Sequence, residues 1–172
     1  MTDTPLRQAL AESLDEVLEK MFFVRSLGEL AGPASGPVTA AHLTFEGDPP
    51  GSLTLRMTPA AARSVAADFL GEEEAELSPK QIGEVVCELA NMICGSVLSR
   101  VERNTTFRLS APRLVASGEE GEPAPGEPGV TDGVPAVPVD ATSYAAEIGS
   151  GAITVIFNTE TPAWSTAEKS EC

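Results

Sequence analysis

The chain has 172 residues, and its 26 Asp and Glu against 11 Lys and Arg give a formal net charge of −15. A chain so acidic repels nucleic acid and anionic lipid, which argues against functions built on phosphate-backbone or membrane-surface contact. Hydrophobic residues make up 42% of the chain, which is enough for a packed interior and excludes wholesale disorder. These values predict a single domain. The polar stretch over 159–172 indicates a flexible tail, so the domain is expected to cover residues 1–158.

The sequence favours a reduced, cytoplasmic protein without a metal site. Its N-terminus has no apolar run of signal-peptide length, and no stretch reaches the roughly 18 apolar residues of a membrane span. The only histidine is His42, which leaves too few good ligands for zinc. Cys87 and Cys94 lie about 10 Å apart along a predicted helix, too far for a disulfide, and Cys172 has no CxxC partner. We expect His42 to be structural or on the surface. For Cys87 and Cys94 we expect packing on the helix face, with a redox role as the alternative.

Three helices are predicted from one local pattern, a Ser or Thr followed by Pro at the first helical position. They cover residues 4–22, 58–70 and 78–101, and the third is the longest. The third also begins with a capping box, because Gln81 follows Ser78 at the required spacing. Apolar residues recur at helical spacing in each segment, so each helix is expected to bury one side.

Alternating apolar and polar residues predict strands over 38–45, 52–57, 105–111, 143–148 and 152–157. Turns rich in Gly and Pro join the first two strands, and a Gly-Ser-Gly turn joins the last two, so both pairs are predicted hairpins. This order of elements indicates an α+β fold, an antiparallel β-sheet with long helices packed on it.

Residues 117–140 differ from the rest of the chain. They contain six acids, five Pro and five Gly, with no Lys or Arg. Such a segment cannot bury enough apolar surface to offset its ordering entropy, so we expect a mobile acidic loop.

The third predicted helix carries a polar row opposite its apolar side. At 100° per residue, one side of this helix is formed by Ile82, Val86, Leu89, Ile93 and Val97. The other side is formed by Glu84, Glu88, Asn91 and Gly95. A row of this kind is usually a solvated helix face. The alternative is a contact surface, because a carboxylate and a carboxamide next to a glycine leave room for another protein.

The spacing of the row favours the second interpretation. Glu84, Glu88 and Asn91 are followed by Pro112, 21 positions beyond Asn91. This pattern resembles that of the CheC/CheX/FliY chemotaxis phosphatases, which have Asp or Ser, three residues, Glu, two residues, Asn, and Pro 21 positions later. The string ELANMICGS is most similar to the CheX branch, and the resemblance covers roughly residues 5–158. Glu84 departs from the usual Asp or Ser, so its role is left unassigned.

The resemblance implies hydrolysis of the aspartyl phosphate of a response-regulator receiver such as CheY. By position, Asn91 would orient the attacking water, and Glu88 would pair with the active-site Lys of the receiver. Glu84, Gly95 and Pro112 are the candidate partner contacts, and the alternative role of Pro112 is to fix the end of a strand. The receiver brings its own Mg²⁺, so no cofactor of this chain is implied, and positioning groups are sufficient for the chemistry.

An alternative is a non-catalytic module that docks receivers or dimerises on the same fold, although a docking face has no need of the Asn91 amide. The resemblance also implies a homodimer. A separate argument for the dimer is that an open sheet has two edges, which Pro, Lys or inward charges usually protect. Residues 152–157 and 53–55 contain none of these, so we expect one of these segments to be an edge that pairs with a second copy.

Overall fold

The computed structural model describes residues 4–32, 37–47, 50–101, 106–115 and 141–159. Its helices are α1 (Thr4–Met21), α2 (Pro59–Leu70), the short 3₁₀ helix η1 (Glu74–Glu76) and α3 (Pro79–Val101). Its strands are β1 (Ser26–Glu29), β2 (Thr39–Glu46), β3 (Gly51–Met57), β4 (Arg108–Leu109), β5 (Arg113–Val115), β6 (Thr142–Ile148) and β7 (Gly151–Thr159).

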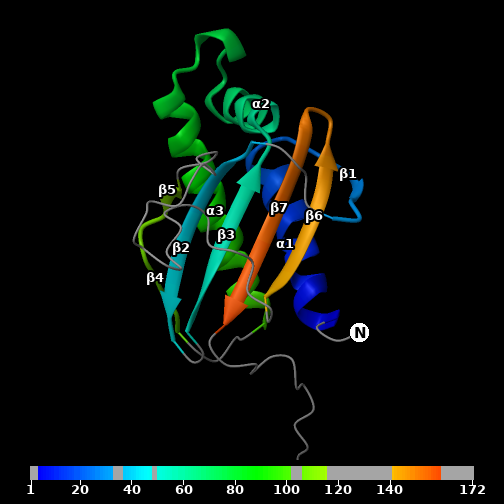
Figure 1. Ribbon diagram of the computed structural model, residues 1–172, viewed down its shortest axis with the longest axis vertical. Helices are drawn as coiled ribbons and strands as arrows, with labels where there is room; N and C mark the ends of the chain where they lie inside the picture. The colour runs from blue at the N-terminus through cyan, green and yellow to red at the C-terminus, as the bar shows by residue number, and fades with distance from the viewer. Residues whose placement is uncertain (1–3, 33–36, 48–49, 102–105, 116–140, 160–172) are drawn as a thin grey trace, which may run out of the picture.

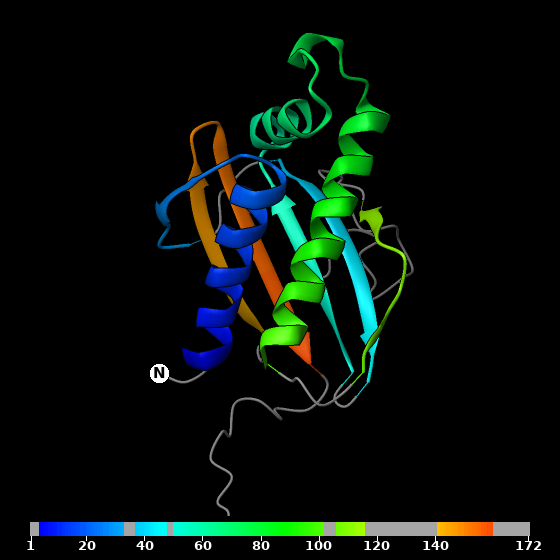
Figure 2. The same cartoon turned by 180° about the vertical axis from the view of Figure 1, so that it is seen from behind.

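The described strands form one antiparallel sheet in the order β1-β6-β7-β3-β2-β4, and β5 also pairs with β2 (Figure 1). The predicted hairpins are β2–β3, in which Thr39 lies opposite Met57, and β6–β7. The two hairpins join where β3 pairs with β7. Helices α1 and α3 lie side by side on one face of this sheet (Figure 2). The predicted α+β fold is confirmed.

The long helices begin and end largely as their local sequences predict. The capping box of α3 is formed, because the Ser78 amide donates to Gln81 Oε1 at 2.8 Å and the Gln81 amide donates to Ser78 Oγ at 3.1 Å. Helix α2 ends at Gly71, whose φ of 70° is left-handed and suits glycine. At the start of α2, Thr58 makes no side-chain cap, and its hydroxyl instead accepts a hydrogen bond from the Ala152 amide.

The hydrophobic core fills the space between the sheet and the helix pair. Helix α1 packs on β6 and α3 packs on β2 and β3, while the two helices contact each other. The largest fully buried side chains of these elements include Leu10, Leu14, Leu18, Leu43, Leu53, Leu55, Leu89 and Ile93. Helix α3 is therefore held against the sheet and α1 by its buried side, which leaves its opposite side available for function.

Helix α3 is long and apolar enough, by length and composition, to cross a membrane. No such segment is expected from the runs of apolar residues in the sequence. Half of its most apolar window is buried inside the protein, where it packs against the sheet and α1. Its apolar character is that of a core helix.

The argument for a dimer through the two unprotected strand runs is wrong. Residues 152–157 lie in β7, which is hydrogen-bonded to β3 on one side and β6 on the other. Residues 53–55 lie in β3, between β2 and β7. Both runs lack protective residues because neighbouring strands already satisfy their backbone groups. The homodimer stays a prediction from the family resemblance alone.

Two strands, β1 and β5, were not predicted. Strand β1 is an edge strand of four residues, and its register shifts between Ser26 and Gly28, where φ is 142°. Strand β5 has only three residues and pairs with Ala40–His42 of β2. Both are too short for alternation to be recognised.

The strand predicted over 105–111 is reduced to the two residues of β4. Next to β4, the Ser110 amide donates to the Thr44 carbonyl at 2.8 Å. In a regular antiparallel ladder the Thr44 amide would donate to the Ser110 carbonyl. Here it donates to Ser110 Oγ instead, at 2.9 Å. The side chain thus replaces the backbone acceptor and ends the ladder.

Residue 105, the acidic segment 117–140 and the tail beyond residue 159 lie outside the described residues, while Thr159 itself belongs to β7.

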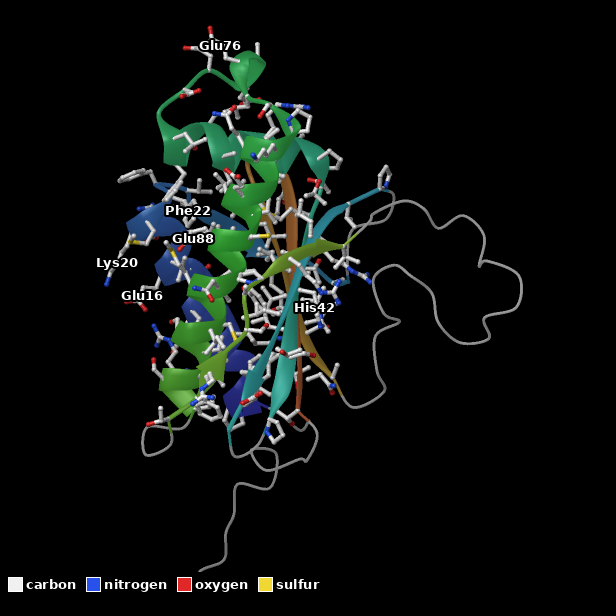
Figure 3. All side chains as sticks on the ribbon, turned by 90° about the vertical axis from the view of Figure 1, so that its left-hand side faces the viewer. Glu16, Lys20, Phe22, His42, Glu76 and Glu88 are labelled. Carbon is white, nitrogen blue, oxygen red and sulfur yellow. The ribbon has the colours of Figure 1, made fainter. Side chains whose placement is uncertain are left out.

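His42 lies on the face of the sheet away from α1 and α3 (Figure 3). Its Nδ1 is 2.8 Å from Thr54 Oγ1, which agrees with the expected structural role. Partial burial lowers the pKa of His42 from its ordinary 6.5, and the neighbouring positive charge of Arg113 lowers it further.

We expect the imidazole of His42 to titrate below pH 6.5 in the folded protein. It is the only histidine, so one Cε1 proton resonance in an NMR titration reports it without assignment. Because the unfolded chain then takes up this proton first, protonation destabilises the fold as the pH falls through 6.5 towards the folded pKa. Arg113→Gln should raise the His42 pKa part of the way, since burial is the larger cause. A folded pKa at or above 6.5 would contradict the placement of His42.

Candidate functional site

The polar row predicted on α3 lies on the exposed side of the helix. Glu84, Glu88 and Gly95 are exposed and Asn91 is half-buried. The opposite stripe, formed by Val86, Leu89, Ile93 and Val97, is buried, and Ile82 at the start of the helix is half-buried. Figure 3 shows Glu88 on the side of α3 that faces away from the sheet. The register of α3 is therefore the one that the periodicity predicts.

A shallow groove of about 350 Å³ runs beside this row. Helix α3 forms one side of the groove, and the segment that leads into β5 forms the other. Its lining residues are Lys80, Gly83, Glu84, Cys87, Glu88, Asn91, Pro112 and Leu114. The structure thus brings Pro112 to Glu84, Glu88 and Asn91, although 21 positions separate Pro112 from Asn91.

Gly95 does not line the groove but continues the row one turn beyond Asn91. A Cβ atom at Gly95 would meet no other group within 4 Å, so the fold itself does not require glycine there. This opening leaves the α3 backbone accessible next to Asn91. The sequence analysis expected this role for Gly95.

Gly83 is the glycine of α3 that the fold requires. A Cβ atom there would come within 2.4 Å of Leu114 Cδ1, so the absence of a side chain lets β5 approach the helix. Leu114 and Lys80 are groove residues that the sequence analysis did not select. The glycine inside a helix was a possible signal, because a helical glycine often marks close packing, but the partner segment could not be identified.

The two cysteines of α3 have the structural environments that were expected. Cys94 is fully buried, and burial raises the pKa of its thiol to about 12. Cys87 is half-buried in the groove, where burial and the nearby Glu84 carboxylate raise the pKa of its thiol. A raised pKa keeps a thiol protonated and unreactive at neutral pH, so neither cysteine is suited to nucleophilic catalysis.

The groups in the groove are suited to binding and orienting rather than to covalent chemistry. The Glu88 carboxylate can pair with a cation on a partner, and the Asn91 carboxamide can donate and accept hydrogen bonds without titrating. Within the described part of the chain, no cluster of three or more His, Cys, Asp or Glu residues could hold a metal ion. The row therefore combines an anionic group that can bind a cation with an amide that can bind a polar group or water.

Comparison with known protein families decides the family. The sequence matches the family model described as chemotaxis phosphatase CheX over residues 39–128, just over half of the chain. The chain belongs to the CheX family. The matched region begins at β2 and contains α3, Pro112 and β5, so it includes the whole groove. Comparison with curated proteins by sequence gives no match.

Solved structures of CheX proteins have the same fold as this CheX-family chain. A CheX protein from Vibrio vulnificus is similar with a TM-score of 0.68 at 15% identity, covering 93% of this chain and 99% of the other. CheX from Desulfovibrio desulfuricans gives a TM-score of 0.64 at 17% identity, covering 90% and 99%. CheX in a CheX–CheY–BeF₃–Mg²⁺ complex from Borrelia burgdorferi gives 0.62 at 16% identity, covering 90% and 97%.

Proposed function

We propose that this CheX-family protein is a phosphatase that hydrolyses the aspartyl phosphate of a CheY-like receiver domain. Family membership supports the activity in general. The observation that carries the proposal for this chain is the position of Asn91 beside Glu88 on the exposed side of α3, in an open groove. The CheX of Borrelia burgdorferi, which is similar in fold, forms a complex with CheY, and this supports the class of partner.

In the proposed mechanism, α3 is inserted at the active site of the receiver. The Glu88 carboxylate forms an ion pair with the receiver's active-site Lys and so fixes the position of the helix. The Asn91 carboxamide accepts a hydrogen bond from a water molecule and so orients the water oxygen towards the phosphorus atom. Phosphoryl transfer passes through a loose transition state, so orientation and charge neutralisation supply most of the catalysis. The receiver contributes the Mg²⁺ ion that neutralises the phosphoryl oxygens.

The remaining residues of the site contact the partner in this proposal. Gly95 lets the receiver approach the α3 backbone one turn beyond Asn91, and Pro112 borders the groove on the opposite side. Glu84 adds a second negative charge next to Glu88. We further propose that the protein is a homodimer, as the family resemblance implies, and that it acts in the cytoplasm, as its unpaired cysteines favour.

Phosphate release from a receiver charged with acetyl phosphate tests the proposal. After excess acetyl phosphate is removed, addition of this protein should accelerate release well above the receiver's own rate of dephosphorylation. The alternative of a docking module predicts a different result, in which the receiver binds but its aspartyl phosphate decays at the unassisted rate. That result would refute the phosphatase and support the docking module.

A further inference from the structure

The two sides of the groove differ in chemistry. Helix α3 presents charged and polar groups, whereas the opposite side is formed by the apolar side chains of Pro112 and Leu114. Leu114 is 47% exposed. The large apolar residues that are exposed in the described part of the chain are Met21, Phe23, Leu27, Leu70 and Leu114. Of these, only Leu114 lines the groove, so the groove combines an acidic helix with an exposed leucine.

Leu114 is held in place by both neighbouring elements. Strand β5 places Leu114 opposite Ala41 of β2, and Ala41 is a member of the core beneath α3. The side chain of Leu114 packs on the α3 backbone at Gly83, where no Cβ intervenes. An apolar side chain that is already positioned loses little conformational freedom when a partner covers it, so it contributes more of its burial to affinity.

The order of groups along α3 defines which partner fits. Lys80, Glu84 and Glu88 follow one another at intervals of one turn, and Leu114 faces this part of the helix. Two carboxylates favour a partner surface that carries a cation. The exposed leucine favours an apolar side chain next to that cation, because contact between the two removes apolar surface from water.

We infer that Leu114 is a second anchor of the receiver-docking surface, which packs against an apolar side chain of the receiver while Glu88 binds the receiver's Lys. This inference rests on the proposed function, because the receiver is the partner of the groove. Leu114 determines affinity and takes no part in the chemistry. The catalytic row and the affinity anchor are thus separate, and they lie on α3 and β5, respectively.

The test measures the dissociation constant of the beryllofluoride-activated receiver, together with kcat and KM for phosphate release. Leu114→Ala should raise the dissociation constant and KM by about tenfold, with kcat within about twofold of wild type. Leu114→Met, which keeps an apolar side chain, should bind nearly as well as wild type. Leu70→Ala is the matched control, because Leu70 is 38% exposed on α2 and does not line the groove. This control should leave the dissociation constant and KM unchanged.

The salt dependence of the dissociation constant distinguishes an apolar contact from an ion pair. The tenfold ratio between Leu114→Ala and wild type should persist at high salt, because apolar contact is not screened. The corresponding ratio for Glu88→Ala should shrink, because salt screens ion pairs near the surface.

Three outcomes would overturn the inference alone. In the first, Leu114→Ala binds the activated receiver as tightly as wild type; in the second, it lowers kcat at unchanged KM while wild type remains active. A wild-type protein that binds no receiver would instead overturn the proposed function, and this inference with it. Circular dichroism melting of each variant shows whether lost affinity reflects lost folding. Leu114→Met with the affinity of Leu114→Ala would also contradict an apolar anchor.

Discussion

Replacing Asn91 by Ala is expected to abolish measurable phosphatase turnover, a loss on the order of 10²–10³ in rate, while the fold and receiver binding remain nearly intact. The fold should survive because Asn91 lies on the side of α3 opposite the buried stripe. Turnover should be lost because alanine cannot position the attacking water. The measurement is phosphate release from the charged receiver, with the dissociation constant of the beryllofluoride-activated receiver determined in parallel.

Variants at Asn91 and Glu88 separate the proposed roles. Asn91→Asp keeps the size of the side chain and an acceptor oxygen. It adds a negative charge next to the anionic phosphoryl group, so it should also be inactive. Glu88→Ala should lose affinity as well as rate, because it removes an ion pair between the two proteins. Ser99→Ala, at an exposed position near the end of α3, is the control and should behave as wild type. Phosphate release near the wild-type rate by Asn91→Ala would refute the water-positioning mechanism.

Truncation of Leu89 or Ile93 to Ala is expected to lower the free energy of unfolding by about 2–5 kcal/mol each. Both side chains are fully buried between α3 and the sheet, so each change removes buried methyl groups and leaves a cavity. A loss of this size is a large part of the stability of a typical domain. Urea unfolding followed by circular dichroism measures it, with Ser99→Ala again as the exposed control from the same helix.

This second result bears directly on the site. The side of α3 that carries Glu88 and Asn91 is exposed only if the side that carries Leu89 and Ile93 is buried, because the residues share one helix. If Leu89→Ala and Ile93→Ala were both as stable as wild type, the register of α3 would be wrong. The row of Glu88 and Asn91 would then lose its place on the surface, whatever the activity of the protein.

Local sequence signals were sufficient to predict the three α-helices, the two hairpins and the polar row on α3. The capping box at Ser78, the glycine at the end of α2 and the Gly- and Pro-rich turns act within a few residues of one another, so their effect does not depend on the rest of the chain. The position of Glu88 and Asn91 on the side of α3 opposite the buried stripe follows from helical periodicity, which acts within one helix.

Only the tertiary structure decided which strands are edges and what faces α3 across the groove. Strand β7 is interior because it pairs with β3, whose residues lie about a hundred positions earlier, and no local pattern encodes that choice of neighbour. Leu114 reaches the groove because three residues of β5 pair with β2 and because Gly83 admits its side chain, contacts that join segments distant in sequence. Such contacts depend on the packing of the whole sheet, whereas a helix register depends on the spacing of residues within one helix. The polar row on α3 was therefore predictable from the sequence, and the apolar side of its groove was not.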